Sequence, residues 1–133
     1  MPTSADAVYL DTSALVKLVR AEAESAALRR YLTARPVRTS SALVRVELVR
    51  AARRHDAEAV AAAHRLLGAI DLITLDEGLL DAAALIGPEV RSLDAIHLAS
   101  AVALGAHLAA LVTYDVRMKA AAASLGLPVA SLG

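Results

Sequence analysis

VYLDTSAL, residues 8–15, is a short apolar run that ends abruptly in a carboxylate. Tyr9 and Leu10 are typical of the end of a buried strand, and Thr12 and Ser13 are typical of a helix cap, so Asp11 falls on the junction between them. In an α/β domain this junction lies at the carboxyl edge of the sheet, where ligands usually bind. An Asp in this position often caps the next helix instead, and the stretch alone leaves both interpretations open.

Length and composition predict one domain over residues 1–133, long enough to bury about two-thirds of its unfolded surface. Hydrophobic residues make up 57% of the chain, yet Phe and Trp are absent. The core must therefore consist mainly of Ala, Leu, Val and Ile, and some of the apolar excess is available for an interface with a partner.

The absence of cysteine excludes disulfides, thiolate metal sites and thiol chemistry. The first residues lack the features of a signal peptide, and no run reaches the roughly 18 apolar residues of a membrane span. We therefore expect a soluble cytoplasmic protein without membrane contact. With 14 basic and 14 acidic residues the net charge is zero, so any nucleic-acid contact requires local clustering of charge.

Strands and helices alternate along the chain. Beyond the strand at 8–10, we expect strands at 37–39, 71–76, 108–113 and 128–130. We expect helices at 14–19, 22–34, 42–52, 56–67, 77–86, 92–105 and 117–125, with Ser40 and Ser41 starting the third and with Asp56 and Ser92 as caps. Parallel strands joined by helical crossovers predict a three-layer α/β domain with a mainly parallel sheet.

Four acidic residues gather in this topology. Asp11 and Asp115 each follow a strand, Asp94 lies in the first turn of a helix, and Glu47 lies inside another helix. Acids that follow parallel strands emerge at one edge of the sheet. Carboxylates that converge repel one another unless a cation neutralises them, and oxygen ligands select a hard ion such as Mg²⁺ or Mn²⁺. Such an ion activates water for attack on phosphorus, so the cluster predicts phosphodiester hydrolysis.

The order and spacing of these fragments resemble a known family. Residues 10–15 (LDTSAL), Ser40-Ser41 with Glu47, residues 93–99 (LDAIHLA) and residues 112–118 (VTYDVRM) are together similar to PIN-domain ribonucleases, specifically the toxins of bacterial VapBC toxin–antitoxin systems. The resemblance extends from Val8 to about Val129.

The resemblance implies a three-layer α/β/α PIN-like fold and a metal-dependent endoribonuclease, with Mg²⁺ or Mn²⁺ as cofactor. The implied partners are RNA as substrate, a VapB-like antitoxin that covers the acidic site, and a second copy in a homodimer. Asp11, Asp94 and Asp115 would be metal ligands, and Glu47 would hold metal-bound water or a second ion. Ser13 and Thr113 resemble the small hydroxyl residues that line such sites.

Several other polar residues lie near these motifs. We expect Arg117 to contact phosphate or to orient Asp115. The basic residues Arg45, Arg50, Arg53 and Arg54 suit RNA phosphates or an antitoxin carboxylate, although a solvated helix face is the simpler interpretation for the last two. His97 follows Asp94 by one helical turn on a largely apolar helix and is interpreted as a structural residue rather than a general base.

Two alternatives remain open at this point. One is another α/β phosphoryl-transfer or receiver domain, for which Asp76 offers a further acid after a strand, although Ser13 stands where a nucleophilic phosphatase would need a second acid. Asp76 is more simply explained as a helix cap. The other is a catalytically silent binding module that has kept its acidic residues.

Overall fold

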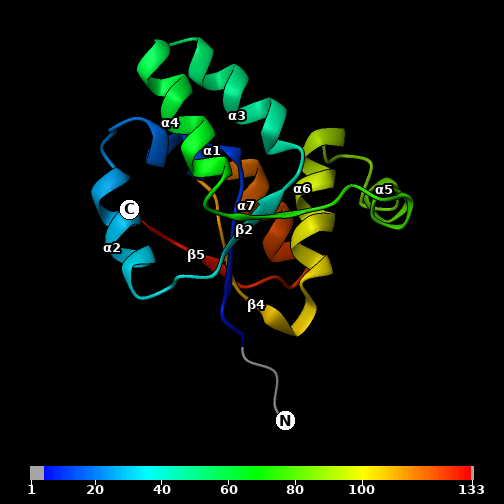
Figure 1. Ribbon diagram of the computed structural model, residues 1–133. Helices are drawn as coiled ribbons and strands as arrows, with labels where there is room; N and C mark the ends of the chain where they lie inside the picture. Colours follow the sequence, from blue (N-terminus) through cyan, green and yellow to red (C-terminus); the bar gives the residue numbers. More distant parts are fainter. Residues whose placement is uncertain (1–4, 133) are drawn as a thin grey trace.

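A five-stranded parallel sheet forms the centre of the molecule and carries helices on both faces (Figure 1). The computed structural model describes residues 5–132. The strand order is β3-β2-β1-β4-β5, and every neighbouring pair is parallel. The strands are β1 (Ala7–Leu10), β2 (Arg38–Ser41), β3 (Asp71–Ile73), β4 (Leu108–Val112) and β5 (Val129–Ala130). The predicted three-layer α/β fold with a mainly parallel sheet is confirmed.

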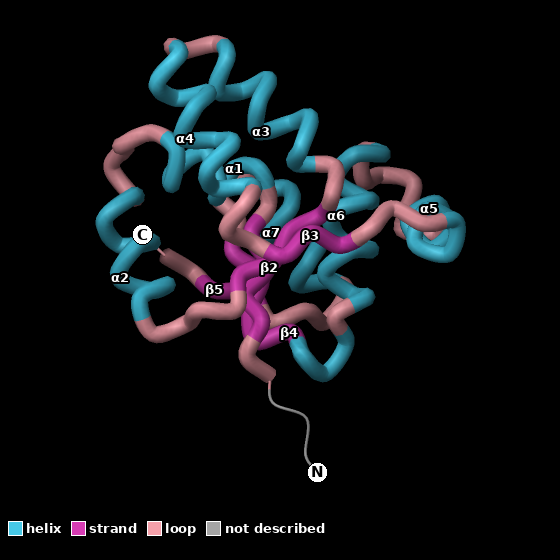
Figure 2. Tube along the Cα trace, in the orientation of Figure 1, coloured by secondary structure: helices cyan, strands magenta, loops and turns pink. Residues whose placement is uncertain are grey.

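Residues 5–132 form seven α-helices, which cover the sheet in two layers except for α5, which packs against α6. They are α1 (Thr12–Val19), α2 (Ser25–Thr33), α3 (Val44–Arg53), α4 (Ala57–Leu67), α5 (Glu77–Ala84), α6 (Ser92–Ala103) and α7 (Val116–Ser124). Helices α1 to α4 pack against the face that carries Val8 and Leu10, whereas α6 and α7 pack against the face that carries Tyr9. In Figure 2, the helices α2 and α6 accordingly lie on opposite sides of the strands.

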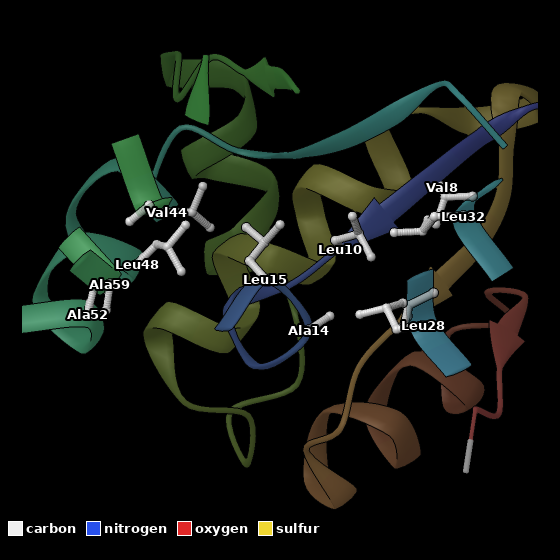
Figure 3. Packing of buried hydrophobic residues seen from close by; sticks show 12 residues of the cluster. Val8, Leu10, Ala14, Leu15, Leu28, Leu32, Val44, Leu48, Ala52 and Ala59 are labelled. Carbon is white, nitrogen blue, oxygen red and sulfur yellow. The ribbon is translucent and has the colours of Figure 1, made fainter. Parts of the chain in front are cut away.

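The larger core consists of aliphatic side chains, as the composition predicts (Figure 3). Leu10 and Leu15 are fully buried there and join β1 to α1. Figure 3 shows the cluster continuing from Val8 to Ala52 and Ala59 of α3 and α4. Within residues 5–132, no helix is both long enough and apolar enough to cross a membrane.

The structure corrects two predicted helix starts. Ser40 and Ser41 belong to β2, and the helix after them begins only at Val44. Strand pairing satisfies their backbone groups, and the buried Ser40 hydroxyl donates a hydrogen bond of 2.6 Å to the carbonyl of Leu10. Ser92 lies inside α6, whose N-cap residue is Arg91 and makes no side-chain capping bond. In both cases the serine pattern was a correct sign of a nearby boundary but not of its position.

Other predicted boundaries differ by a few residues. The second helix begins at Ser25 rather than Glu22, because Glu22 donates its backbone N–H to the Ser25 hydroxyl in a turn before the helix. The third strand ends at Ile73, and Asp76 caps α5 by accepting a hydrogen bond of 2.8 Å from the amide of Leu79. Asp56 caps α4 in the same way, through the amide of Ala59.

Candidate functional site

The carboxyl ends of β1 and β4 form the floor of the candidate site. The two strands are neighbours, with Leu10 paired to Val112. The residues that follow them therefore meet: the Tyr114 amide donates a hydrogen bond of 2.9 Å to the Ser13 hydroxyl, and the hydroxyls of Ser13 and Thr113 lie 3.3 Å apart. Asp11 and Asp115 thus emerge at the same edge of the sheet.

Asp11 is almost completely buried, with 3% of its surface exposed. Its Oδ1 accepts hydrogen bonds from the Ser13 hydroxyl (2.7 Å) and from the Ala14 amide (3.0 Å), and its Oδ2 accepts one from the Thr113 hydroxyl. Burial raises the pKa of Asp11 even though these donors oppose the shift.

Asp11 is also the N-cap residue of α1. The prediction that Thr12 and Ser13 form the cap is wrong, because both lie within the helix and their hydroxyls point to other acceptors. Capping and membership of an acidic site are therefore compatible: one carboxylate oxygen holds the helix start and the other contacts Thr113.

Glu47 reaches the same region from α3. Its Oε1 accepts hydrogen bonds from the Thr12 hydroxyl (2.7 Å) and from Nε2 of His97 (2.8 Å). Burial alone would raise the pKa of Glu47, but the hydrogen bonds from His97 and Thr12 outweigh burial and lower it. Glu47 is therefore held as a carboxylate at neutral pH.

A buried chain of hydrogen bonds from β1 and α6 holds the Glu47 carboxylate in place. The Tyr9 hydroxyl lies 2.7 Å from Nδ1 of His97, and both side chains are buried. Since Glu47 only accepts, Nε2 of His97 carries a proton, and in the neutral imidazole Nδ1 then accepts from the Tyr9 hydroxyl. The chain runs from Tyr9 through His97 to Glu47, which gives His97 the structural role that the sequence suggested.

Asp94 and Asp115 interact through their charges. Burial raises the pKa of Asp94, and the nearby Asp115 carboxylate raises it further, with a smaller contribution from Glu47. Asp115 caps α7: its Oδ1 accepts hydrogen bonds from the amides of Arg117 (2.8 Å) and Met118 (3.0 Å). The Asp115 amide donates to the Thr113 hydroxyl, which links Asp115 to Asp11.

The donor chemistry of these acids suits a hard divalent cation. All four side chains present carboxylate oxygens, and Asp115 disfavours the charged form of Asp94, which a cation between them would relieve. Within residues 5–132, however, no three His, Cys, Asp or Glu side chains lie close enough together to hold a metal ion. The oxygen donors of these acids suit a hard metal ion, and Asp94 and Asp115 lie near enough for their charges to interact, but the side chains do not form a complete set of ligands.

The predicted supporting residues have different surroundings. Ser13 and Thr113 both contact Asp11 directly. Arg117 contacts Asp115 through its backbone amide, while its exposed side chain has no hydrogen bond or ion pair within residues 5–132. The exposed arginines Arg50, Arg53 and Arg54 line a shallow hollow at the end of α3.

The sequence pattern does not single out Tyr9 and Thr12 as residues of the site. It predicts a helix cap for Thr12 and a core position for Tyr9, which lies within an apolar strand. Their proximity to Asp11 in the sequence was the available signal, since side chains next to a strand end lie close to the site. Only the packing of α3 and α6 shows that both hydroxyls serve the Glu47–His97 pair.

Curated relatives match nearly the whole chain. Ribonuclease VapC46 of Mycobacterium tuberculosis is 51% identical over 124 residues, which cover 92% of this chain and 95% of the relative. Ribonuclease VapC35 of the same species is 47% identical over 131 residues, which cover 95% of this chain and 97% of the relative.

Solved structures share the fold. The Mycobacterium tuberculosis toxin VapC20, described as cleaving the sarcin–ricin loop, superposes with a TM-score of 0.69 at 23% identity, covering 86% of this chain and 94% of VapC20. VapBC2 from Rickettsia felis, bound to a DNA fragment from its promoter, gives a TM-score of 0.69 at 14% identity, covering 95% of this chain and 99% of the matched chain. The PIN domain family matches residues 8–124. The chain therefore belongs to the PIN-domain family and, within it, to the VapC ribonucleases.

Proposed function

We propose that this protein is an endoribonuclease that hydrolyses RNA phosphodiester bonds and acts as the toxin of a type II toxin–antitoxin system. The observation that carries the proposal is the 51% identity to ribonuclease VapC46 over 92% of the chain. The contacts of the four acids support it: Thr113 links Asp11 and Asp115 at the ends of β1 and β4, the Asp115 charge acts on Asp94, and Glu47 bonds to Thr12, next to Asp11.

The proposed cofactor is Mg²⁺ or Mn²⁺, with Asp11, Asp94 and Asp115 as ligands and Glu47 beside them. When bound, this ion would activate water and stabilise the leaving oxygen. Neighbouring side chains hold two of these carboxylates in place by hydrogen bonds. Ser13 and Thr113 hold that of Asp11, while Thr12 and His97 hold that of Glu47. These hydrogen bonds keep both side chains in one orientation before substrate arrives.

The proposed protein partner is a VapB-like antitoxin. A toxin–antitoxin complex from Klebsiella pneumoniae superposes with a TM-score of 0.68, covering 85% of this chain and 90% of the matched chain, which supports a fold able to form such a complex. A homodimer is also proposed, and exposed apolar side chains such as Val46, Leu85 and Val116 are available for interfaces. Copurification with the product of a small adjacent reading frame would test the antitoxin partner.

Cleavage of labelled single-stranded RNA by the purified, partner-free protein tests the activity. We expect cleavage with Mg²⁺ or Mn²⁺ and none with chelator. Asp11→Asn and Asp94→Asn should each lower kcat/KM by at least about 100-fold, since even changes to residues that support metal ligands cost about 10–100-fold. Asp81→Asn, on the exposed face of α5, is the matched control. Full cleavage by both site variants, or a loss shared with the control, would refute the assignment.

A further inference from the structure

A groove lies next to the acidic site, between α6 and α7. It has a volume of about 360 Å³, and Asp94 belongs both to its wall and to the acidic site. This volume lies at the lower end of the range of about 300–1,000 Å³ that small-molecule pockets occupy. The groove therefore suits one compact group rather than a folded partner.

The wall of the groove is mainly aliphatic. Val90, Leu98, Met118 and Ala121 belong to one hydrophobic cluster and face the groove, with Leu98 and Met118 buried at its base. None of the three tyrosines lines it. A group bound here would rest against apolar side chains, without an aromatic stack.

Two basic and two acidic side chains also line the groove. Arg91 and Arg117 both line the groove and are exposed; the Arg91 charge acts on the Asp94 carboxylate, but neither guanidinium forms an ion pair or hydrogen bond within residues 5–132. Guanidinium groups without a protein partner suit phosphate oxygens. The carboxylates of Asp94 and Glu89 also line the groove; they accept hydrogen bonds from amino groups at a base edge but repel phosphate.

We infer that this groove binds one unpaired base of the RNA substrate, next to the phosphate that is cleaved, with Arg91 and Arg117 contacting the adjoining phosphates. The inference rests on the proposed ribonuclease function and deepens it. Single-stranded RNA presents splayed bases with apolar faces and polar edges, followed at once by phosphates. The aliphatic wall of the groove would contact the face of a base, and the two exposed guanidinium groups would contact the phosphates that follow it. Asp94, which lines both the groove and the acidic site, would place that base next to the site.

A base-deletion experiment combined with groove filling tests the inference. The substrate is a single-stranded RNA with one main cleavage site, compared with versions that carry an abasic ribose at each neighbouring position. Ala120→Trp fills the groove from an exposed position on α7, and Ala123→Trp places the same side chain on α7 outside the groove. Circular dichroism and thermal unfolding establish that each variant folds.

In the wild type and in Ala123→Trp, an abasic ribose at one position should lower kcat/KM by about tenfold, which corresponds to about 1.4 kcal/mol of lost interaction with the base. Ala120→Trp should cleave the intact RNA about tenfold less and should show no further loss with the abasic RNA. Ser124→Trp, also exposed and lining the groove, replaces Ala120→Trp if that variant does not fold.

An abasic penalty that is the same in Ala120→Trp and in the wild type would overturn the inference. The same conclusion follows if Ala120→Trp weakens only the binding of a copurified protein partner, because the groove would then be a protein-docking surface. If the wild type cleaves no RNA with Mg²⁺ or Mn²⁺, the proposed function itself fails. These results are distinguishable, since the first two require an active wild-type enzyme.

Discussion

Tyr9→Phe removes one oxygen atom from the buried chain that supports Glu47. Tyr9 is fully buried, and its hydroxyl is the donor 2.7 Å from Nδ1 of His97, which is itself only 2% exposed. Phenylalanine keeps the ring but leaves Nδ1 buried without a donor, a loss that costs about 1–3 kcal/mol. For a domain of this size each kcal/mol lowers Tm by about 3–5 °C. A loss of about 2 kcal/mol therefore predicts a Tm lower by about 6–10 °C.

Tyr114→Phe is the matched control for this prediction. The Tyr114 hydroxyl is also buried, but it has no hydrogen-bond partner within residues 5–132. Its removal should leave the free energy of unfolding unchanged or raise it by about 1 kcal/mol, because an unpaired buried hydroxyl is costly. The two substitutions delete the same atom, so the difference between them measures what the contacts of the Tyr9 hydroxyl, chiefly its hydrogen bond to His97, add to stability.

Urea unfolding, cleavage kinetics and nitrogen NMR of His97 together measure the effect. Tyr9→Phe should lower kcat by about 10–100-fold, as expected for a group that orients a site carboxylate through another side chain. The NMR spectrum of the wild type should show His97 protonated at Nε2 and unprotonated at Nδ1. Equal unfolding free energies for the Tyr9 and Tyr114 variants, or a wild-type His97 protonated at Nδ1 alone, would refute the reasoning.

Two further predictions concern stability. Asp94 has a raised pKa in the folded protein, so its contribution to stability is fully present below the ordinary value of 3.8 and is lost as the pH rises through the folded value. In metal-free buffer, Asp94→Asn should therefore become more stable relative to the wild type as the pH increases from about 4 to about 7. Mg²⁺ should raise the Tm of the wild type but not that of the variant. If the unfolding free energies of the two proteins changed in parallel with pH, the raised pKa of Asp94 would be contradicted. Asp56→Ala removes the cap of α4 and should lower the unfolding free energy by about 1 kcal/mol in urea, whereas Asp81→Ala on α5 should change it by less than about 0.5 kcal/mol.

The sequence by itself determined the class of fold, and it named four acids as candidates for the site. Apolar periodicity and helix caps are local signals, and they predicted the alternation of strands and helices and the caps at Asp56 and Asp76. Asp11 and Asp115 follow neighbouring parallel strands, so the rule that such residues share one sheet edge was enough to bring them together.

Only the tertiary structure decided how those acids are held. Ser40 and Ser41 have the local pattern of a helix start, yet backbone pairing with β3 places them in a strand, and the Ser40 hydroxyl bonds to Leu10 of β1. The contacts from Thr12 and His97 to Glu47 join α1, α3 and α6. Such contacts depend on how separate helices pack on the sheet, which no local propensity encodes. For Asp11, packing of β1 against β4 adds the Thr113 bond to the helix cap, so one buried carboxylate holds the start of α1 and joins it to the end of β4.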